Sequence, residues 1–315
     1  MKPIVTLTLN PCIDGAAQAD AVRPTRKIRT RDERYDPGGG GINVSRVIAE
    51  LGGPTLPVFL SGGATGPVLD AMLRERGFDT RPVPVADHTR ISHAVYETAS
   101  GLEYRFVPEG PEVTATEWSA CLDALRTLDF DWLVASGSLP RGLPPGCLTE
   151  IAVLSAERGA RLVLDTSGPA LAPTLASGAV YLAKPSIGEF RALTGAPLGS
   201  VAEVAAAARA RIAADNIGIL AISMGHHGAL LATADHAWTL APPILPVQSA
   251  TGAGDAFLGA MVLTLACGGT PLESLAQGVS AGGATVLTPG TGLCRRDDVA
   301  RIRAALTPPV PVPSD

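Results

Sequence analysis

Residues 161–183 read RLVLDTSGPALAPTLASGAVYLA. The apolar runs at the two ends, 161–165 and 180–183, are typical of buried strands, and the segment 169–176 between them favours a helix. A strand, a helix and a second strand in this order predict parallel strands joined by a right-handed crossover. These residues therefore indicate an α/β protein.

The same alternation continues on both sides of this unit. The expected strands are 4–9, 56–60, 132–135, 161–165, 180–183 and 217–223, and the expected helices are 67–76, 145–158, 169–176, 187–193 and 201–214. This order predicts a doubly wound, mostly parallel sheet flanked by helices. In such a sheet, ligands bind beyond the carboxyl ends of the strands.

Two segments interrupt the alternation. Residues 12–36 and 88–108 interleave polar and apolar side chains between turn residues, which is typical of extended strands outside the main sheet. We expect them to form a small β-sheet lid over an α/β core made of residues 1–11, 37–87 and 109–308. Residues 309–315 are proline-rich and are expected to be a flexible tail.

The composition excludes several classes of protein. With 46% hydrophobic and 17% charged residues, the chain has ample material for a core and is not disordered. Its net charge of −5 comes without a long run of like charges, so we expect no nucleic acid and no membrane as partners. We expect a cytoplasmic protein for three reasons. The cysteines are scattered, the sequence lacks an apolar segment of membrane length, and the N-terminus is unlike a signal peptide.

The segment ATGAGDAF at 250–257 precedes an apolar helix and carries the strongest chemical signal. Glycines at a helix start let backbone N–H groups converge, and the helix N-terminus adds partial positive charge. The segment could therefore bind a phosphoryl group, with Asp255 placed to accept a proton from an attacking hydroxyl. The alternative is a simple turn in which Asp255 is an ordinary N-terminal helix residue.

A second glycine-rich segment, PGGGGINV at 37–44, also precedes an apolar helix. Four successive glycines cost conformational entropy, which is explained if the backbone approaches another group closely or adopts positive φ angles. A flexible hinge is the alternative. Asn43, at the helix start, could cap the helix or hydrogen-bond a ligand hydroxyl.

Together, GGGGINVSRVIAELGG at 38–53 and ATGAGDAFLGAM at 250–261 resemble the two signatures of the PfkB/ribokinase family of carbohydrate kinases. Further matching segments are TLTLNPCID at 6–14, SGGATG at 61–66, SGSLPRG at 136–142, VLDTSG at 163–168, LAKPS at 182–186, ISMGHHGAL at 222–230 and GTGLC at 290–294. Within the family, TLTLNPCID, the four glycines and DHTR at 87–90 are most similar to the branch that acts on fructose 6-phosphate. Relatives acting on fructose 1-phosphate or tagatose 6-phosphate typically carry a lysine inside the glycine run, which this chain lacks.

The resemblance implies roles for individual residues. Asp255 would deprotonate the attacking sugar hydroxyl, and Gly252, Ala253 and Gly254 would form the anion hole. Lys27, on a lid strand, would bridge the sugar side and the nucleotide phosphates. The sugar phosphate would be bound by Asp14, Lys27, Gly38, Gly39, Asn43, Ser138 and Asp255, with Arg90 gripping the 6-phosphate across a dimer interface.

The resemblance also implies a nucleotide side. ATP would be bound by Lys184, Ser186, Ser223, Gly225 and Gly228, with Glu189 organising Mg²⁺ through water and with Ser249, Thr251 and Gly290 contributing to a site for K⁺. Two positions depart from the family pattern, because Ser186 replaces a common asparagine and Gly292 stands where similar relatives tend to have arginine. The first departure could alter metal affinity, since a serine hydroxyl has a shorter reach and no amide donor.

These roles imply a ribokinase-like homodimer, paired through its lid, that uses ATP and Mg²⁺ to convert fructose 6-phosphate to fructose 1,6-bisphosphate by in-line transfer. Fructose 1-phosphate, tagatose 6-phosphate, a free sugar or a nucleoside are alternative acceptors. A non-catalytic sensor of sugar phosphate or nucleotide is an alternative of another class.

Overall fold

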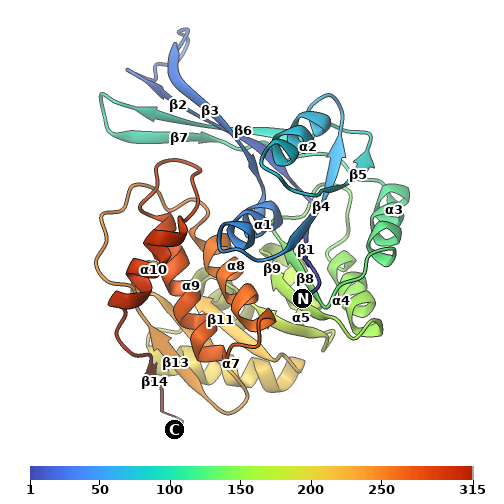
Figure 1. Cartoon of the computed structure of the whole chain (residues 1–315), viewed down its shortest axis with the longest axis vertical. Coiled ribbons are helices and arrows are strands. Elements are labelled where there is room, and N and C mark those ends of the chain that lie inside the picture. Colours follow the sequence, from blue (N-terminus) through green and yellow to red (C-terminus); the bar gives the residue numbers. More distant parts are fainter. Residues whose placement is uncertain (314–315) are drawn as a thin grey trace.

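A ten-stranded sheet forms the body of the protein in the computed structural model, which describes residues 1–313 (Figure 1). The strand order is β14-β13-β12-β11-β10-β9-β8-β1-β4-β5. The strands are β1 (Ile4–Thr8), β4 (Thr55–Gly62), β5 (Arg81–Val85), β8 (Trp132–Ser136), β9 (Arg161–Asp165), β10 (Val180–Ala183), β11 (Ile219–Ser223), β12 (Ala229–Ala232), β13 (Ala237–Leu240) and β14 (Val310–Pro311). Neighbours from β5 to β11 pair in parallel, and β12 to β14 extend the sheet antiparallel. The predicted mostly parallel sheet is confirmed.

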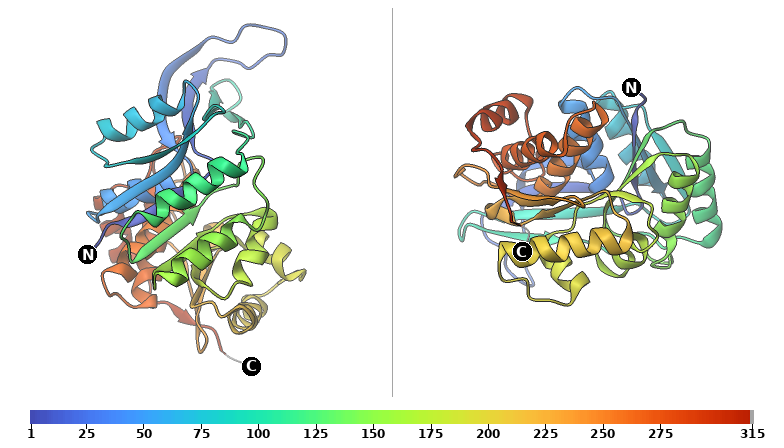
Figure 2. Two further views of the ribbon diagram at one scale, coloured as in Figure 1. Left: turned by 90° about the vertical axis from the view of Figure 1, so that its right-hand side faces the viewer. Right: turned by 90° about the horizontal axis from the view of Figure 1, so that it is seen from below.

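Helices cover both faces of this sheet (Figure 2). One face packs against α3 (Ala115–Arg126), α4 (Cys147–Glu157), α5 (Leu171–Leu175), α6 (Ile187–Thr194) and α7 (Val201–Asp215). The other packs against α1 (Gly40–Glu50), α8 (Ala253–Ala266) and α9 (Pro271–Thr285), with α10 (Arg296–Ala305) joining them and α2 (Gly66–Glu75) lying nearer the second sheet. Within residues 1–313, no helix has both the length and the apolar character needed to cross a membrane.

The expected strands and helices are present, with shifts at their ends, but several elements were not predicted. These are β5, β12, β13, α3, α9 and α10. The helices α8 and α9 follow one another without a strand between them, so the alternation that guided the prediction stops there. Both α3 and α9 begin with a capping box, formed by Thr114 with Glu117 and by Thr270 with Glu273, which is a readable sequence signal.

A separate four-stranded sheet, the lid sheet, lies at the top of Figure 1. It consists of β3 (Thr30–Gly38), β2 (Cys12–Ala19), β6 (Arg90–Glu97) and β7 (Leu102–Phe106), in that order. The predicted small second sheet is therefore confirmed. Strand β3 continues to Gly38, past the expected boundary at residue 36, and leads almost directly into α1.

The expected flexible tail at 309–315 is corrected in part. Val310 and Pro311 form β14, which pairs with β13, and the N–H of Val312 donates to the carbonyl oxygen of Ala237 at 2.9 Å. Alternating prolines leave the N–H groups of the two valines free to bond an exposed sheet edge, and an edge strand tolerates proline. The last two residues, 314 and 315, lie outside the described residues.

The glycine run leaves no room for side chains where β3 meets α1. A Cβ at Gly41 would lie 2.5 Å from Oγ1 of Thr8 in β1. At Gly40 a Cβ would collide with Oγ of Ser136, and Gly39 has a φ of +106°, in the left-handed region that favours glycine. The run is therefore a close-packed junction rather than a flexible hinge.

We expect Gly41→Ala to lower the free energy of unfolding by about 1–3 kcal/mol, because the added methyl group overlaps Thr8 and forces α1 away from β1. Gly146→Ala is the matched control, since Gly146 has a φ of −78° and a Cβ there meets nothing within 4 Å. Its stability should stay within about 0.5 kcal/mol of the parent protein. Urea denaturation measures both variants, and equal stabilities would contradict the close packing at residue 41.

Candidate active site

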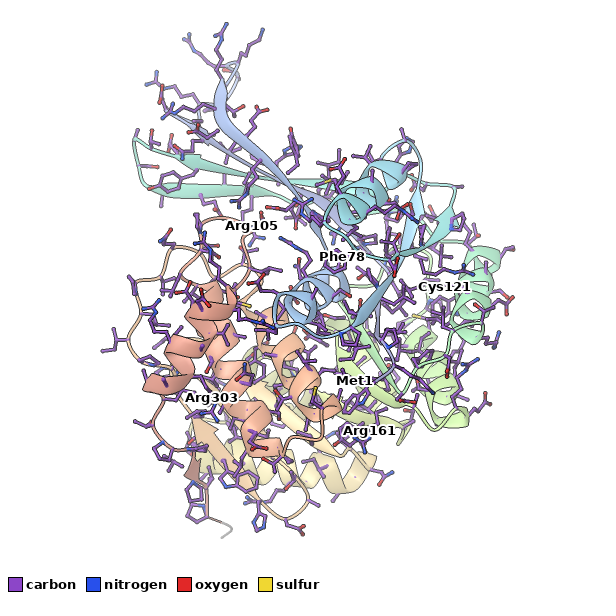
Figure 3. The ribbon with its side chains drawn as sticks, viewed as in Figure 1. Met1, Phe78, Arg105, Cys121, Arg161 and Arg303 are labelled. Carbon is purple, nitrogen blue, oxygen red and sulfur yellow. The ribbon has the colours of Figure 1, made fainter. Side chains whose placement is uncertain are left out.

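The carboxyl ends of the parallel strands face the lid sheet, and most of the expected site residues gather there. A small cavity between the lid sheet and the core is lined by Asp14 and Ser92 from the lid strands and by Thr251 and Gly290 from core loops. Arg105, another lining residue, is labelled in Figure 3 where the lid sheet faces the core. Residues of the lid sheet and of the core therefore line the same cavity.

The two glycine-rich segments meet at a single hydrogen bond. Asn43 lies in the first turn of α1 and Asp255 in the first turn of α8, and Nδ2 of Asn43 donates to Oδ2 of Asp255 at 2.9 Å. The helices approach closely because Gly259 has no side chain, as a Cβ there would lie 3.1 Å from the carbonyl oxygen of Val44. Both motifs therefore contribute to holding one carboxylate.

Asp255 has a strongly raised pKa. Burial, followed by the negative charge of Asp165, raises the pKa of Asp255 to about 7. The hydrogen bond from Asn43 and the positive charge of Lys184 oppose this rise. A carboxyl that titrates near neutral pH can accept a proton from a hydroxyl more readily than an ordinary aspartate, which suits a general base.

Lys184, which follows β10, is buried beside Asp255. Its Nζ forms an ion pair with Oδ1 of Asp165 at 3.1 Å. Burial alone would lower the pKa of Lys184, but the charges of Asp165, Asp255 and Glu189 raise it overall. Burial raises the pKa of Asp165 and Lys184 opposes that rise; we regard the pair as ionised, because a neutral Asp165 would leave the buried ammonium without its counter-charge. The site therefore contains a fixed positive charge.

This positive charge lies at the segment expected to form the anion hole. Gly252 caps α8 with a φ of +77°, and Ala253 begins the 14-residue helix. A Cβ at Gly254 would lie 3.4 Å from Nζ of Lys184, so the ammonium is next to the first turn. One of the expected donors, the N–H of Ala253, is used internally, because it bonds the carbonyl oxygen of Ala250 at 3.3 Å. The helix N-terminus and the lysine together favour an anion.

Asp14 is oriented by two residues that the sequence analysis missed. Its Oδ1 accepts hydrogen bonds from the thiol of Cys12, at 2.9 Å, and from the hydroxyl of Ser92. Burial and the charge of Asp14 raise the pKa of Cys12, so this residue remains a thiol donor. Oδ2 lies against Gly38, where a Cβ would collide with it. The signal for Ser92 was only its position opposite Asp14 on the neighbouring strand, which requires the register to be known.

Arg90 and Ser138 lie around Asn10, at the end of β1. Arg90 donates from Nη2 to the carbonyl oxygen of Asn10 and from Nη1 to that of Pro108, both at 3.0 Å. Its Nε is buried without a hydrogen-bond partner among the described residues. Nδ2 of Asn10 donates to Oγ of Ser138 at 3.2 Å. These contacts place Arg90 and Ser138 at the same strand end.

Lys27 does not lie on a lid strand as predicted. It was expected on a lid strand beside the nucleotide phosphates, but it is exposed and lies in the loop between β2 and β3. Both figures of the whole chain show this loop at the far tip of the lid sheet, away from α8 (Figures 1 and 2). Within one chain, the structure does not bring Lys27 together with the other expected residues. The loop has four arginines and lysines, and charged residues of this kind are usually solvated.

The expected ATP-binding residues lie on two adjacent strand ends. Ser186 follows β10 and Ser223 ends β11, and the two form a single parallel bridge. The chain then turns through Gly225 and Gly228, whose φ angles of +61° and +86° favour glycine. Lys184, two residues before Ser186, connects these strand ends to the first turn of α8.

Glu189 takes part in a helix cap. Its Oε2 accepts hydrogen bonds from the N–H of Ser186 at 2.7 Å and from the hydroxyl of Ser186 at 2.8 Å. The N–H of Glu189 in turn donates to Oγ of Ser186, so the pair is a capping box at the start of α6. The serine that departs from the family pattern therefore binds one oxygen of the carboxylate expected to organise Mg²⁺. A carboxylate and a hydroxyl are suitable ligands for a hydrated Mg²⁺ ion.

The three residues expected at a K⁺ site are close together. Oγ of Ser249 donates to the carbonyl oxygen of Gly290 at 2.8 Å and accepts from the N–H of Thr251 at 3.2 Å. Hydroxyl and carbonyl oxygens are the ligand types that hard cations prefer. The bonds between them tie the loop before α10 to the start of α8.

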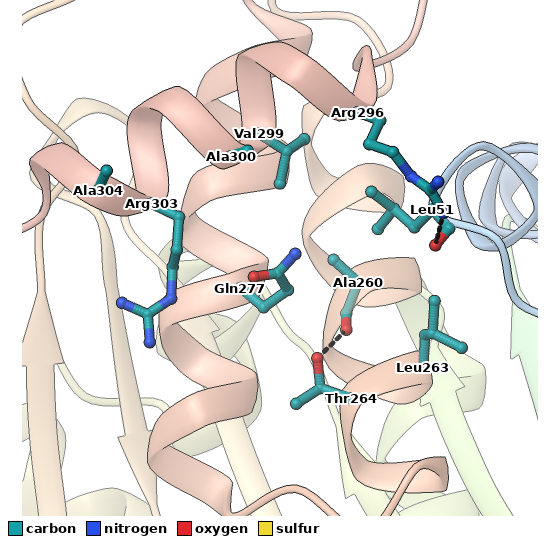
Figure 4. A pocket seen from close by; sticks show the side chains of 10 residues that line it. All are labelled: Leu51, Ala260, Leu263, Thr264, Gln277, Arg296, Val299, Ala300, Arg303 and Ala304. Atoms are coloured by element: carbon teal, nitrogen blue, oxygen red, sulfur yellow. Dashed lines mark hydrogen bonds between the residues drawn. The ribbon is translucent and has the colours of Figure 1, made fainter.

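Two larger cavities lie outside this cluster. One, of about 450 Å³, is lined by α8, α9 and α10 and is shown in Figure 4, where Arg296 is held by its 2.7 Å bond to the carbonyl oxygen of Leu51. The other, of about 670 Å³, borders the turn after β11 and is lined in part by Met224, His227 and Arg191. Neither cavity contains Asp255 or Asp14.

Comparison with known sequences identifies relatives over the full length. Residues 7–298 match the family described as pfkB family carbohydrate kinase. The chain is 41% identical to the ATP-dependent 6-phosphofructokinase isozyme 2 of Mycobacterium tuberculosis, covering 100% of this chain and 93% of that protein. It is 37% identical to the protein of the same name from Escherichia coli, covering 98% and 100%. A 1-phosphofructokinase from Xanthomonas campestris is 36% identical, with 87% of each chain covered.

Solved structures agree with these relatives. The phosphofructokinase-2 from Escherichia coli in complex with potassium has a TM-score of 0.93 at 37% identity, covering 97% of this chain and 99% of that one. The same enzyme in complex with fructose-6-phosphate has a TM-score of 0.91 at 36% identity, with the same coverage. The predicted ribokinase-like fold and the predicted resemblance to the family branch that acts on fructose 6-phosphate are thereby confirmed. The chain belongs to the pfkB family of carbohydrate kinases.

Proposed function

We propose that this protein is an ATP-dependent 6-phosphofructokinase, which transfers the γ-phosphoryl group of ATP to the 1-hydroxyl of fructose 6-phosphate. The observation that carries this proposal is Asp255, a carboxylate with a raised pKa beside a helix N-terminus and a buried lysine. The full-length similarity to enzymes named for this reaction supports the acceptor.

The proposed chemistry is a single in-line displacement. Asp255 takes the proton of the sugar hydroxyl, the oxygen bonds to the γ-phosphorus, and the bond from that phosphorus to the bridging oxygen of ADP breaks. Lys184 and the N–H groups of Gly252 and Gly254 stabilise the charge on the transferred group. The products are fructose 1,6-bisphosphate, ADP and the proton on Asp255.

On the sugar side, the free Oδ2 of Asp14 accepts hydrogen bonds from sugar hydroxyls, next to the backbone of Gly38 and Gly39. Arg90 binds the 6-phosphate, since a guanidinium has five donors and only two are used by backbone carbonyls. Ser138 lies at the same strand end and is a further sugar ligand. Lys27 has no part in this proposal for a single chain.

On the nucleotide side, Ser186, Ser223, Gly225 and Gly228 line the phosphates of ATP beside Lys184. Mg²⁺, held through water by Glu189, neutralises phosphate charge when bound. K⁺ is proposed at the loop of Ser249, Thr251 and Gly290, where it supports the start of α8. The fold neighbour determined with potassium motivates this part of the proposal.

A second candidate function is phosphorylation of fructose 1-phosphate. The relative named 1-phosphofructokinase, 36% identical over most of both chains, favours it. Against it stands the packing of the glycine run, where Gly38, Gly40 and Gly41 have no space for a lysine side chain.

The lid sheet is proposed to pair two copies of the chain. Leu102 and Phe106 are 60% and 57% exposed, and both alternate along β7 with Glu103 and Arg105, which line the cavity. They therefore lie on the opposite face of the lid sheet, since successive strand residues point to opposite faces. Exposed apolar groups on so small a sheet are typical of an interface. A second lid sheet covering this face accounts for them.

The acceptor is tested by measuring ADP release with fructose 6-phosphate, fructose 1-phosphate, tagatose 6-phosphate and free fructose. We expect the highest kcat/KM with fructose 6-phosphate, and Asp255→Asn should lower kcat by roughly 10²–10⁴-fold because the proton acceptor is lost. Sugar binding by this variant, measured by calorimetry, should persist. A preference for fructose 1-phosphate would select the second candidate, and binding without ADP release from any acceptor would indicate a sensor.

Activity should fall as the pH drops below about 7. Asp255 must be ionised to accept a proton, and its pKa of about 7 lies far above the ordinary value of 3.8. The pH profile of kcat/KM should therefore show an acid limb near neutrality. The phosphate of the substrate also titrates, at about pH 6. Asn43→Leu separates the two, because loss of its hydrogen bond raises the pKa of Asp255 and moves only a limb that belongs to this carboxyl.

The lid interface is tested by sedimentation of the parent protein and of Phe106→Glu. We expect a dimer for the parent and a shift toward monomer for the variant, because a buried, unpaired carboxylate opposes association. Val153→Glu, at a residue of α4 that is 48% exposed, is the control and should sediment as the parent does. A monomeric parent protein, or a Phe106→Glu variant that stays fully dimeric, would rule out this interface.

A further inference from the structure

Asp36, near the end of β3, is a buried carboxylate that gathers several donors. It is 7% exposed and pairs with Arg34 at 3.0 Å, Arg76 at 3.1 Å and Arg46 at 3.7 Å. The hydroxyl of Thr291 donates to its Oδ2 at 2.6 Å. A buried charge persists in a fold only when it is paired. Asp36 therefore fixes the positions of side chains from the lid sheet, α1, the end of α2 and the loop before α10.

Arg46 is the member of this group that leads to the active site. Its Nη1 donates to Oδ1 of Asn43 at 3.1 Å and to the carbonyl oxygen of Pro37 at 3.0 Å. Asn43 in turn donates from Nδ2 to Asp255 at 2.9 Å. Asp36, Arg46, Asn43 and Asp255 thus form a continuous chain of polar contacts from the lid sheet to the proposed base.

The two polar atoms of an asparagine side chain are chemically different, so the contacts from Arg46 through Asn43 to Asp255 require one orientation of the amide. Oδ1 only accepts and Nδ2 only donates. With a guanidinium on one side and a carboxylate on the other, only one orientation of Asn43 satisfies both neighbours. The reversed amide would set its oxygen against Asp255 and its NH₂ group against Arg46. Without Arg46, nothing on that side opposes the reversal.

We propose that Arg46 is a positioning residue for phosphoryl transfer, and that it holds Asn43 in the orientation that donates to Asp255. Asp36 holds Arg46 in place for this purpose. The inference deepens the proposed function, on which its kinetic part rests. It goes beyond that function because Arg46 is not among the proposed substrate ligands and its hydrogen bonds end on Pro37 and Asn43.

Loss of Arg46 has a consequence for the base that a simple loss of stability does not have. The charged groups that act on Asp255 are Asp165 and Asp14, which raise its pKa, and Lys184, which lowers it. These are unchanged when Arg46 is replaced. The hydrogen bond from Asn43 lowers the pKa of Asp255, so an amide that is held only by Asp255 donates less firmly and leaves the base more protonated at neutral pH.

The chain provides a matched control in Arg76. Its guanidinium also pairs with Oδ1 of Asp36, at 3.1 Å, but its other hydrogen bond is to the carbonyl oxygen of Met72, at 2.9 Å. Arg76→Gln and Arg46→Gln therefore each remove one guanidinium from the same carboxylate. Only Arg46→Gln removes the contact with Asn43.

The experiment compares these two variants in the full chain with fructose 6-phosphate and ATP. We expect Arg46→Gln to lower kcat about tenfold and to move the acid limb of kcat up by roughly half a pH unit. KM for ATP should change less than about twofold, because the hydrogen bonds of Arg46 all end on β3 and α1. Arg76→Gln should keep the kcat and the acid limb of the parent protein.

Arg46→Lys is the second variant if Arg46→Gln does not fold. Lysine keeps the positive charge near Asp36 but cannot serve its several acceptors from a planar fork, so a smaller change of the same sign is expected. The inference is overturned if the Arg46 variants keep the kcat and acid limb of the parent protein. It is equally overturned if Arg76→Gln changes both as strongly, because the group around Asp36 would then act through stability alone.

A carbon-13 NMR titration of the Asp255 carboxyl makes the same comparison without turnover. We expect its midpoint to rise in Arg46→Gln and not in Arg76→Gln. If the parent protein phosphorylates no sugar phosphate, the proposed function fails while this readout still decides the role of Arg46. An unchanged midpoint in Arg46→Gln would refute that role by itself.

Discussion

The site depends on the close approach of the backbone at residues 38–41 to the strand ends of the core. Gly38 lies against the carboxylate of Asp14, and Gly40 lies against Ser136. Since a side chain at either place would collide with these groups, the lid sheet and α1 can have only one separation from the main sheet. That separation fixes where Asp14 of the lid strand lies relative to Asn43 of α1. The four glycines cost conformational entropy, but they allow the backbone to approach these groups closely.

Around the proposed base, buried carboxylates outnumber buried ammonium groups. Asp165 and Asp255 share one buried ammonium, that of Lys184, and burial, followed by the negative charge of Asp165, raises the pKa of Asp255. The N-terminus of α8, whose first turn contains Asp255, supplies partial positive charge. The site thereby combines a proton acceptor with a region that attracts anions, although both lie within the same short segment of sequence. The backbone N–H groups of the first turn allow a carboxylate and an anion-binding region to lie this close together.

Much of the fold could be predicted because the alternation of strands and helices is local. The glycine segments were also readable, since four glycines in sequence demand a structural reason. The contact of Ser92 with Asp14 was not, because it depends on the pairing of β2 with β6 across more than seventy residues. Cys12 lies two residues before Asp14 on the same strand, so its contact required only that this segment be extended. The helices α3 and α9 carried their signal in capping boxes rather than in alternation.

The position of Lys27 in a loop differs from the lid strand that the family resemblance predicted. A family motif assigns a residue to a site by its order in the sequence, whereas a long loop between β2 and β3 leaves its position in space undetermined. The C-terminal segment 309–313 is ordered although its sequence predicted a flexible tail. Its prolines favoured an unpaired segment, but the free edge of β13 offered hydrogen bonds that a local pattern does not reveal.

The bond between Asn43 and Asp255 joins residues 212 positions apart. At a synthesis rate of about 5–20 residues per second, α1 leaves the ribosome roughly 10–40 seconds before α8. During that interval the N-terminal half has its glycine junction but lacks the carboxylate that Asn43 orients. In the main sheet β1 lies between β4 and β8, both of which are synthesised after α1. A chain that ends before α8 therefore contains the proposed sugar ligands Asp14 and Arg90 but lacks the proposed base.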